Sequence, residues 1–169
     1  SGSERAAVGA RSRAGDRRVP GGDRQGPAGR ERGRALDPGN LAAAFFEGDA
    51  YASVAQRARD RGDDPAPAAA RAADAYTRGL AANPGVPLLL NGLAMTRTSQ
   101  AEDAWSRGEA PEPYTALAIA AATQAIVAAP DQAFGYANLG DALARRARWL
   151  WLRGGDGVPA ITGAIDALV

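Results

Sequence analysis

The chain has 169 residues and a net charge of only +1, which suits a single domain or a short array of repeats. It contains neither cysteine nor histidine, and this excludes disulfides, thiolate chemistry, zinc sites of the usual ligand types and histidine-based catalysis. No run of about 18 apolar residues occurs, and no apolar segment follows the first arginines, so we expect a soluble, cytoplasmic protein with no membrane span, metal or cofactor.

Residues 1–35 have a composition of their own. They carry nine arginines against four acidic residues, whereas the rest of the chain carries eleven arginines against fifteen acidic residues. Their only large apolar side chains are Val8 and Val19. Such a segment cannot bury enough surface to offset the entropy of ordering it, so we expect a disordered arm rich in Arg and Gly. Gly21, Gly22 and Pro27 leave a degraded repeat as the alternative.

Three sequence marks recur every 46 residues in the remainder of the chain, residues 36–169. The first is a proline, at Asp37-Pro38, Asn83-Pro84 and Ala129-Pro130. The second is an Arg-Gly pair, at Arg61-Gly62, Arg107-Gly108 and Arg153-Gly154. The third is again a proline, at Pro67, Pro113 and Pro159. We therefore expect three copies of one unit, at about residues 38–83, 84–129 and 130–169, the last one truncated, in a fragment of a longer array.

Each mark has a mechanical meaning for a helix. Asp or Asn before proline is typical of a helix N-terminus, so we expect a first helix to begin at Pro38, Pro84 and Pro130. Glycine adopts the left-handed backbone at no steric cost, so this helix should end at the glycine of each Arg-Gly pair. The third mark should then open a second helix. The predicted unit is an αα-hairpin, and the predicted fold class is all-α.

Small and apolar residues fall at helical spacing between the marks. In the first copy they recur every three to four positions, at Leu41, Phe45, Gly48, Tyr51, Ala55 and Ala58. Small residues also match between copies, as in Gly48/Ala94/Gly140, Ala72/Ala118/Ala164 and Gly79/Ala125. Small side chains let two helix backbones approach closely, as a packed hairpin requires.

At this level of detail the chain resembles tetratricopeptide repeats, whose unit has 34 residues. The resemblance rests on Leu139-Gly140 and Leu143 in a first helix, and on Ala72, Tyr76, Gly79 and Pro84 around a second. With about twelve residues inserted, the unit is similar to long repeats in the C-terminal regions of bacterial serine/threonine protein kinases. The resemblance implies a helical-hairpin solenoid. Glu47 and Arg97 stand where that family has a leucine and an aromatic residue.

The resemblance also implies a function, since the first helices of such arrays line a groove that receives a peptide or a partner's helix. We therefore predict a protein–protein interaction scaffold and not an enzyme. We call a residue's place within the 46-residue unit its frame position. From these positions, the residues expected to face the groove are Phe45, Asp49, Ser53, Asn91, Met95, Ser99, Phe134, Asn138, Asp141 and Arg145. The alternative for these positions is an ordinary solvated face.

Two other functions remain open. The array could be the non-catalytic regulatory arm of a serine/threonine kinase whose catalytic domain lies outside this chain. Direct nucleic-acid binding through the arginines of residues 1–35 is the weaker alternative, because no aromatic residues lie between them. The version of the family that grips a carboxylate uses lysine, which this chain lacks; Asn91 and Arg145 are what remains of such a site.

Several further residues invite a chemical interpretation. Trp105 and Trp151 share one frame position, and we expect them to pack against the loop prolines and not to stack on bases. Trp149 falls outside that frame and is expected to be exposed. We expect the loop acids Asp63, Asp64, Glu109 and Glu112 to complement helix dipoles and not to act in catalysis. Residues 154–157 lack the Lys-Ser/Thr of a phosphate-binding loop.

Overall fold

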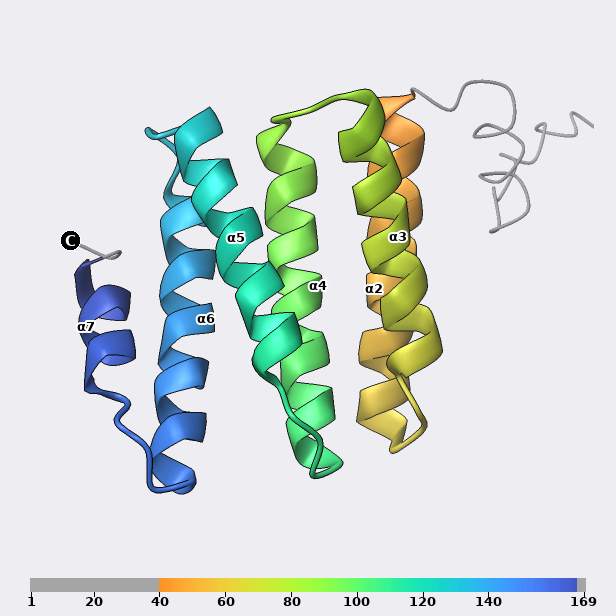
Figure 1. Ribbon diagram of the computed structural model, residues 1–169. Helices are drawn as coiled ribbons and strands as arrows, with labels where there is room; N and C mark the ends of the chain where they lie inside the picture. The colour runs from red at the N-terminus through yellow and green to blue at the C-terminus, as the bar shows by residue number, and fades with distance from the viewer. Residues whose placement is uncertain (1–39, 167–169) are drawn as a thin grey trace, which may run out of the picture.

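The structure, a computed structural model, describes residues 40–166, and within that range every regular element is an α-helix and no strand occurs. The helices are α2 (Leu41–Arg61), α3 (Ala66–Ala82), α4 (Pro87–Ser106), α5 (Glu112–Ala128), α6 (Ala133–Leu152) and α7 (Val158–Asp166) (Figure 1). The all-α prediction is confirmed for this part of the chain. The expected disordered arm, residues 1–35, and the expected helix start at Asp37-Pro38 lie outside the described residues.

The helix bounds repeat the 46-residue period. The first helix of each unit begins at Leu41, Pro87 and Ala133, and the second begins at Ala66, Glu112 and Val158. Within each unit the two helices pack against each other, α2 on α3, α4 on α5 and α6 on α7. The predicted αα-hairpin therefore occurs three times.

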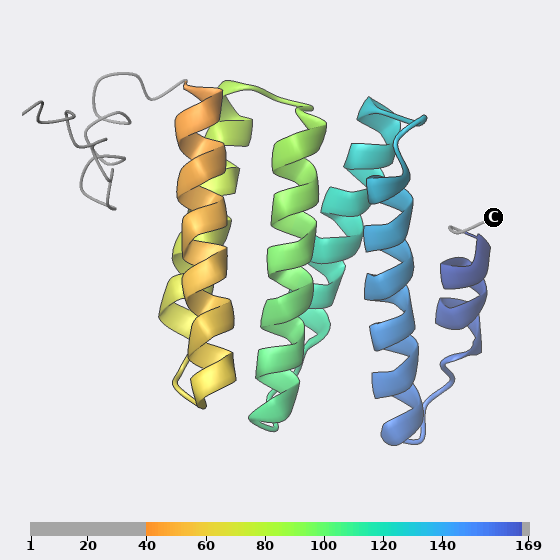
Figure 2. The same ribbon diagram turned by 180° about the vertical axis from the view of Figure 1, so that it is seen from behind.

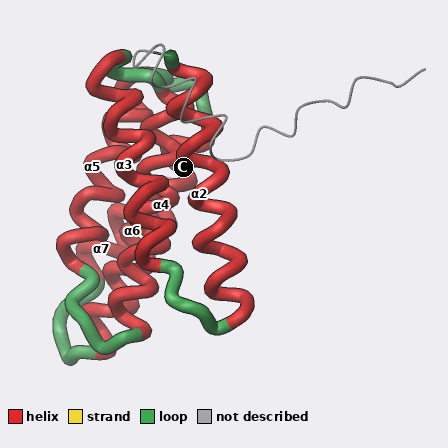
Figure 3. The backbone as a smooth tube through the Cα atoms, turned by 90° about the vertical axis from the view of Figure 1, so that its right-hand side faces the viewer, coloured by secondary structure: helices red, strands yellow, loops and turns green. Residues whose placement is uncertain are grey.

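The hairpins stand side by side in chain order and form two layers. Figure 2 shows the first helices α2, α4 and α6 in front, with α3 and α5 behind them. Successive hairpins pack through α3 on α4 and α5 on α6, and also through α2 on α4 and α4 on α6. The loops gather at the two ends of the helices (Figure 3), so the faces of both layers consist of helix surface.

The first helices end at glycine, as predicted. Gly62, Gly108 and Gly154 all adopt the left-handed conformation with φ of 75°. The residue after each glycine donates its backbone N–H to a carbonyl in the last helical turn: Asp63 to Ala58 (2.9 Å), Glu109 to Ala104 (2.9 Å) and Gly155 to Leu150 (2.8 Å). Three copies thus use one C-terminal hydrogen-bond pattern, which requires a residue that tolerates positive φ.

The predicted starts of the first helices are wrong by three residues. Pro84 and Pro130 lie in turns, and α4 begins at Pro87 and α6 at Ala133. A proline disfavours helical backbone in the residue before it, and Asn83 (φ −133°) and Ala129 (φ −150°) are indeed non-helical. These prolines therefore end the preceding second helix.

Among the three first helices, only α2 has a side-chain hydrogen bond that caps its N-terminus. The side chain of Asn40 accepts a hydrogen bond from the backbone N–H of Ala43 at 3.0 Å. The residues at the same frame position before α4 and α6 are Val86 and Gln132, and neither side chain makes such a bond.

The predicted starts of the second helices are confirmed, with Pro67, Pro113 and Pro159 in the first turn. Of the four loop acids expected to complement helix dipoles, Asp64 and Glu112 lie at the starts of α3 and α5, whereas Asp63 and Glu109 pair with arginines. Asp64 accepts a hydrogen bond from Ala66 N at 2.9 Å, and Asp156, in the same frame position, accepts one from Val158 N at 2.9 Å. Exposed Arg61–Asp63 and Arg107–Glu109 ion pairs, both 2.8 Å, close two of the loops.

The core consists mainly of alanine, so the helices lie close together. Gly79 of α3 shows how close: a Cβ added there would lie 2.7 Å from both Ala44 Cβ on α2 and Leu89 Cδ1 on α4. Leu89 itself has no exposed surface and is the largest fully buried side chain among the described residues. The close approach predicted for the small positions is therefore real at Gly79, where three helices meet.

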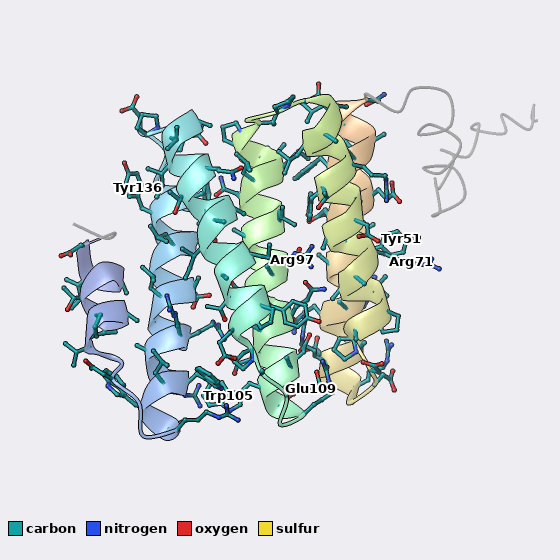
Figure 4. All side chains as sticks on the ribbon, in the orientation of Figure 1. Tyr51, Arg71, Arg97, Trp105, Glu109 and Tyr136 are labelled. Carbon is teal, nitrogen blue, oxygen red and sulfur yellow. The ribbon has the colours of Figure 1, made fainter. Side chains whose placement is uncertain are left out.

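Glu47 and Arg97, the two residues that depart from the tetratricopeptide pattern, both make polar contacts. Glu47 is buried and accepts a hydrogen bond from Arg78 Nη2 across the first hairpin at 3.0 Å. Arg97 is half-buried and donates to Gln100 Oε1 at 2.9 Å. The first-copy equivalent of Arg97 is Tyr51, whose ring lies 5.5 Å from the guanidinium of Arg71 on α3 (Figure 4).

Candidate functional site

A groove of about 710 Å³ runs between α2 and α4 on the layer of first helices. Its walls extend from Phe45 to Arg59 on α2 and from Val86, just before α4, to Ser99 on α4, a length of about 20 Å at 1.5 Å per residue. Gln132 and Phe134, at the start of α6, also line the groove. The volume exceeds what one side chain fills and falls in the range of ligand-binding clefts.

Seven of the ten predicted groove residues line this groove: Phe45, Asp49, Ser53, Asn91, Met95, Ser99 and Phe134. The other three lie on α6 beyond it and contact their neighbours. Asn138 donates to Asn91 Oδ1 at 2.9 Å, and Arg145 pairs with Asp141 on its own helix and with Glu102 on α4. The structure thus brings the predicted residues together around one junction, α2 with α4, and not along the whole array.

Comparison of frame-equivalent residues explains why the groove opens at this junction. Between α4 and α6, Asn138 and Arg145 reach across to Asn91 and Glu102. Their equivalents one copy earlier on α4 are Gly92 and Ser99, which have no side chain or a short one, and both line the groove. Two bridges that link α4 to α6 are therefore missing between α2 and α4.

Tyr76 of α3 forms the floor of the groove. Its ring lies between two glycines, because a Cβ on Gly48 of α2 would be 2.5 Å from the ring and one on Gly92 of α4 would be 2.6 Å from it. In the next copy the equivalents of Tyr76, Gly48 and Gly92 are Ala122, Ala94 and Asn138. At the first junction the larger residue of this pair, Tyr76, lies on the second helix, whereas at the next junction the larger residue, Asn138, lies on the first helix of the following hairpin. The α4–α6 junction therefore lacks an aromatic groove floor.

One end of the groove is fixed by a charge pair. The guanidinium of Arg59 on α2 holds the carboxylate of Asp103 on α4 through two hydrogen bonds, Nε to Oδ1 at 2.7 Å and Nη2 to Oδ2 at 2.8 Å. Both side chains are largely buried, and such bidentate pairing is geometrically specific. This pair therefore links the two groove walls near the C-terminal ends of α2 and α4.

The environment of Tyr76 gives a measurable signature. Burial raises the pKa of Tyr76 to about 12, and the negative charge of Asp49 on the groove wall acts in the same direction. A tyrosine in the unfolded chain titrates near 10. Between pH about 10 and about 12 the unfolded state therefore loses a proton that the folded state keeps, so stability falls as pH rises through this window.

We expect Tyr76→Phe to remove that part of the alkaline loss. The measurement is the free energy of unfolding in urea for both proteins at several pH values between about 9 and 12. The two curves should run parallel below pH about 10 and diverge above it, with the wild type losing more. Parallel curves over the whole range would contradict the burial of this hydroxyl.

Two of the three tryptophans, Trp105 and Trp149, lie at the junction between α4 and α6, whereas the ring of Trp151 lies beside Gly157 in the loop before α7. Trp149 is 7 % exposed and Trp151 is 49 % exposed, so the prediction that Trp149 is exposed is wrong. Trp149 and Trp105 line one small cavity together with Pro111 (Trp105 is labelled in Figure 4), and the guanidinium of Arg148 lies 4.8 Å from the centre of the Trp105 ring. Trp105 and Trp149 occupy the frame positions of Arg59 and Asp103, so an aromatic pair takes the place of the charge pair.

Neither a metal site nor the carboxylate grip is formed by the residues that the structure describes. Between residues 40 and 166 no group of three His, Cys, Asp or Glu side chains could hold a metal ion. The suggested carboxylate grip is not formed there, since Asn91 and Arg145 are engaged with separate partners. None of the helices described is both long and apolar enough to cross a membrane.

The sequence patterns did not predict that Tyr76 forms the groove floor or that Arg59 pairs with Asp103 at one end of the groove. In the sequence, Tyr76 fits the tetratricopeptide-like pattern of a second helix, and neither Gly92 nor Arg59 belongs to a repeated mark. The signal that reveals them is the comparison of copies, in which Tyr76, Gly92 and Arg59 all differ from their equivalents. No protein-family model matches the chain, and no curated protein shows a significant sequence match to it.

Proposed function

We propose that this chain is a tetratricopeptide-like solenoid that acts as a protein–protein interaction scaffold, and that the groove between α2 and α4 binds a segment of a partner protein. The observation that carries the proposal is the exposed apolar surface on the groove walls. Leu88 (49 % exposed), Met95 (60 %) and Phe134 (71 %) all line the groove and face solvent. Clustered exposed apolar side chains around a cleft are typical of interaction sites.

The dimensions of the groove favour a peptide. A length of about 20 Å accommodates a helix of about 14 residues, or a shorter extended segment. Apolar anchors spaced along an amphipathic helix suit a groove of this kind. The polar side chains Asn91, Ser53 and Ser99 offer hydrogen bonds along its edges.

The proposal is tested by selecting binders from a displayed library of random peptides of about 14 residues against the full chain. We expect selected peptides to lose about tenfold or more in affinity for the Met95→Arg protein, since a long cation would fill the groove and charge its apolar wall. Affinity is measured by fluorescence anisotropy with the labelled peptides.

The matched control is Val127→Arg, which places the same side chain at an exposed apolar position on α5, in the other layer. This protein should bind the peptides as the wild type does. Selected peptides that bind Met95→Arg undiminished would show that they dock elsewhere, and the groove would lose its proposed role.

A further inference from the structure

The groove carries one carboxylate that has no counter-ion among the described residues. Asp49 projects from α2, is exposed and lines the groove. The one cationic residue that lines the same groove, Arg59, is held by Asp103 in a bidentate pair. Within residues 40–166, the groove therefore presents one negative charge without a counter-ion, the carboxylate of Asp49, beside an apolar surface.

The third copy shows how the array satisfies such a carboxylate. Asp141 occupies the frame position of Asp49, and Arg145 binds it through Nε at 3.0 Å while Nη1 reaches Glu102 at 2.8 Å. In the first copy the residue in place of Arg145 is Ser53, which is too short to form an ion pair and carries no charge. The guanidinium that lies beside Asp141 is thus absent beside Asp49.

We propose that the groove selects amphipathic segments that carry an arginine or lysine among their apolar residues, and that this cation pairs with Asp49. The inference rests on the proposed function and specifies its partner class. Apolar anchors would contact Phe45, Met95 and Phe134, while the basic side chain would occupy the space that Arg145 fills in the third copy. Carboxylates in the partner would be disfavoured, because Asp49 would repel them.

The test compares library selections on the wild-type chain and on the Asp49→Asn chain. Peptides from the wild-type selection should share a basic residue at a fixed distance from their apolar anchors, and peptides selected on Asp49→Asn should not. For one selected peptide, replacing that residue by Gln should weaken binding to the wild type about threefold to fivefold, the size expected of a partly exposed ion pair. Binding to Asp49→Asn should be the same for both peptides.

Two controls sharpen the result. Asp74→Asn removes an exposed carboxylate from α3, outside the groove lining, and should keep the preference for the basic peptide. A synthetic peptide of residues 1–35, which is rich in arginine but nearly free of large apolar groups, should compete poorly. Effective competition by that peptide would mean that charge alone governs binding and would overturn the inference.

The remaining outcomes separate the two proposals. Peptides that require Met95 but bind equally with Lys, Gln or Glu at the tested position would leave the groove function intact and refute the role of Asp49. Peptides that are indifferent to both Met95→Arg and Asp49→Asn would refute the groove itself, and the inference with it.

Discussion

Leu89→Ala is expected to lower the free energy of unfolding by about 3 kcal/mol, within the range of about 2–5 kcal/mol for leucine truncations in closed cores. Leu89 has no exposed surface and packs against Gly79 at the place where α2, α3 and α4 meet. The buried residues clustered with it include Ala44 and Ala72, whose short side chains cannot move into the vacated space. Urea denaturation followed by circular dichroism measures the loss.

Leu117→Ala is the matched control for this experiment. Leu117 lies on α5 and is 48 % exposed, so its truncation removes less buried area and leaves no cavity. We expect it to cost less than about 1 kcal/mol. Equal losses in the two proteins would mean that the packing at Gly79 is looser than the structure shows.

Gly92→Asn is expected to lower the free energy of unfolding by about 2 kcal/mol. A side chain at this position would overlap the Tyr76 ring, and the ring cannot retreat because Gly48 touches its other face. Overpacking of this kind costs about 1–3 kcal/mol, and it outweighs the small gain in helix propensity when glycine is replaced. Ala120→Asn, at an exposed position on α5, measures the cost of asparagine in a helix without the clash.

The same substitution should be nearly harmless when Tyr76 is replaced by alanine. The second junction already has that combination, with Ala122 on α5 and Asn138 on α6. The two changes should therefore couple strongly in a double-mutant cycle, by more than about 1 kcal/mol. Additive effects would show that Tyr76 and Gly92 do not share one space.

The period and the helix ends were predictable because they depend on local backbone chemistry. Glycine at a left-handed helix end is a property of the residue itself, and Gly62, Gly108 and Gly154 were placed correctly. The helix start predicted at Asn83-Pro84 is wrong because the same dipeptide can open a helix or end one. Only the restriction that Pro84 imposes on Asn83 decides between these two uses.

The groove was predictable as a face but not as a cavity. Helical frame alone placed Phe45, Met95 and Phe134 on one surface, because the first helices share that face in every copy. Whether the surface is hollow depends on pairs of residues in different hairpins, such as Gly92 with Tyr76. No local pattern identifies such a pair. The burial of Trp149 escaped prediction for the same reason, since it depends on the neighbouring hairpin.

The order of helix contacts has a consequence for the way this protein loses its structure. Among the six described helices, close packing links only chain neighbours and successive first helices. Cooperativity in such an array is short-ranged, so we expect local opening of α6 and α7 to leave α2, α3 and α4 assembled. Gln132 and Phe134 would then leave the groove lining, while the walls on α2 and α4 would keep their contacts.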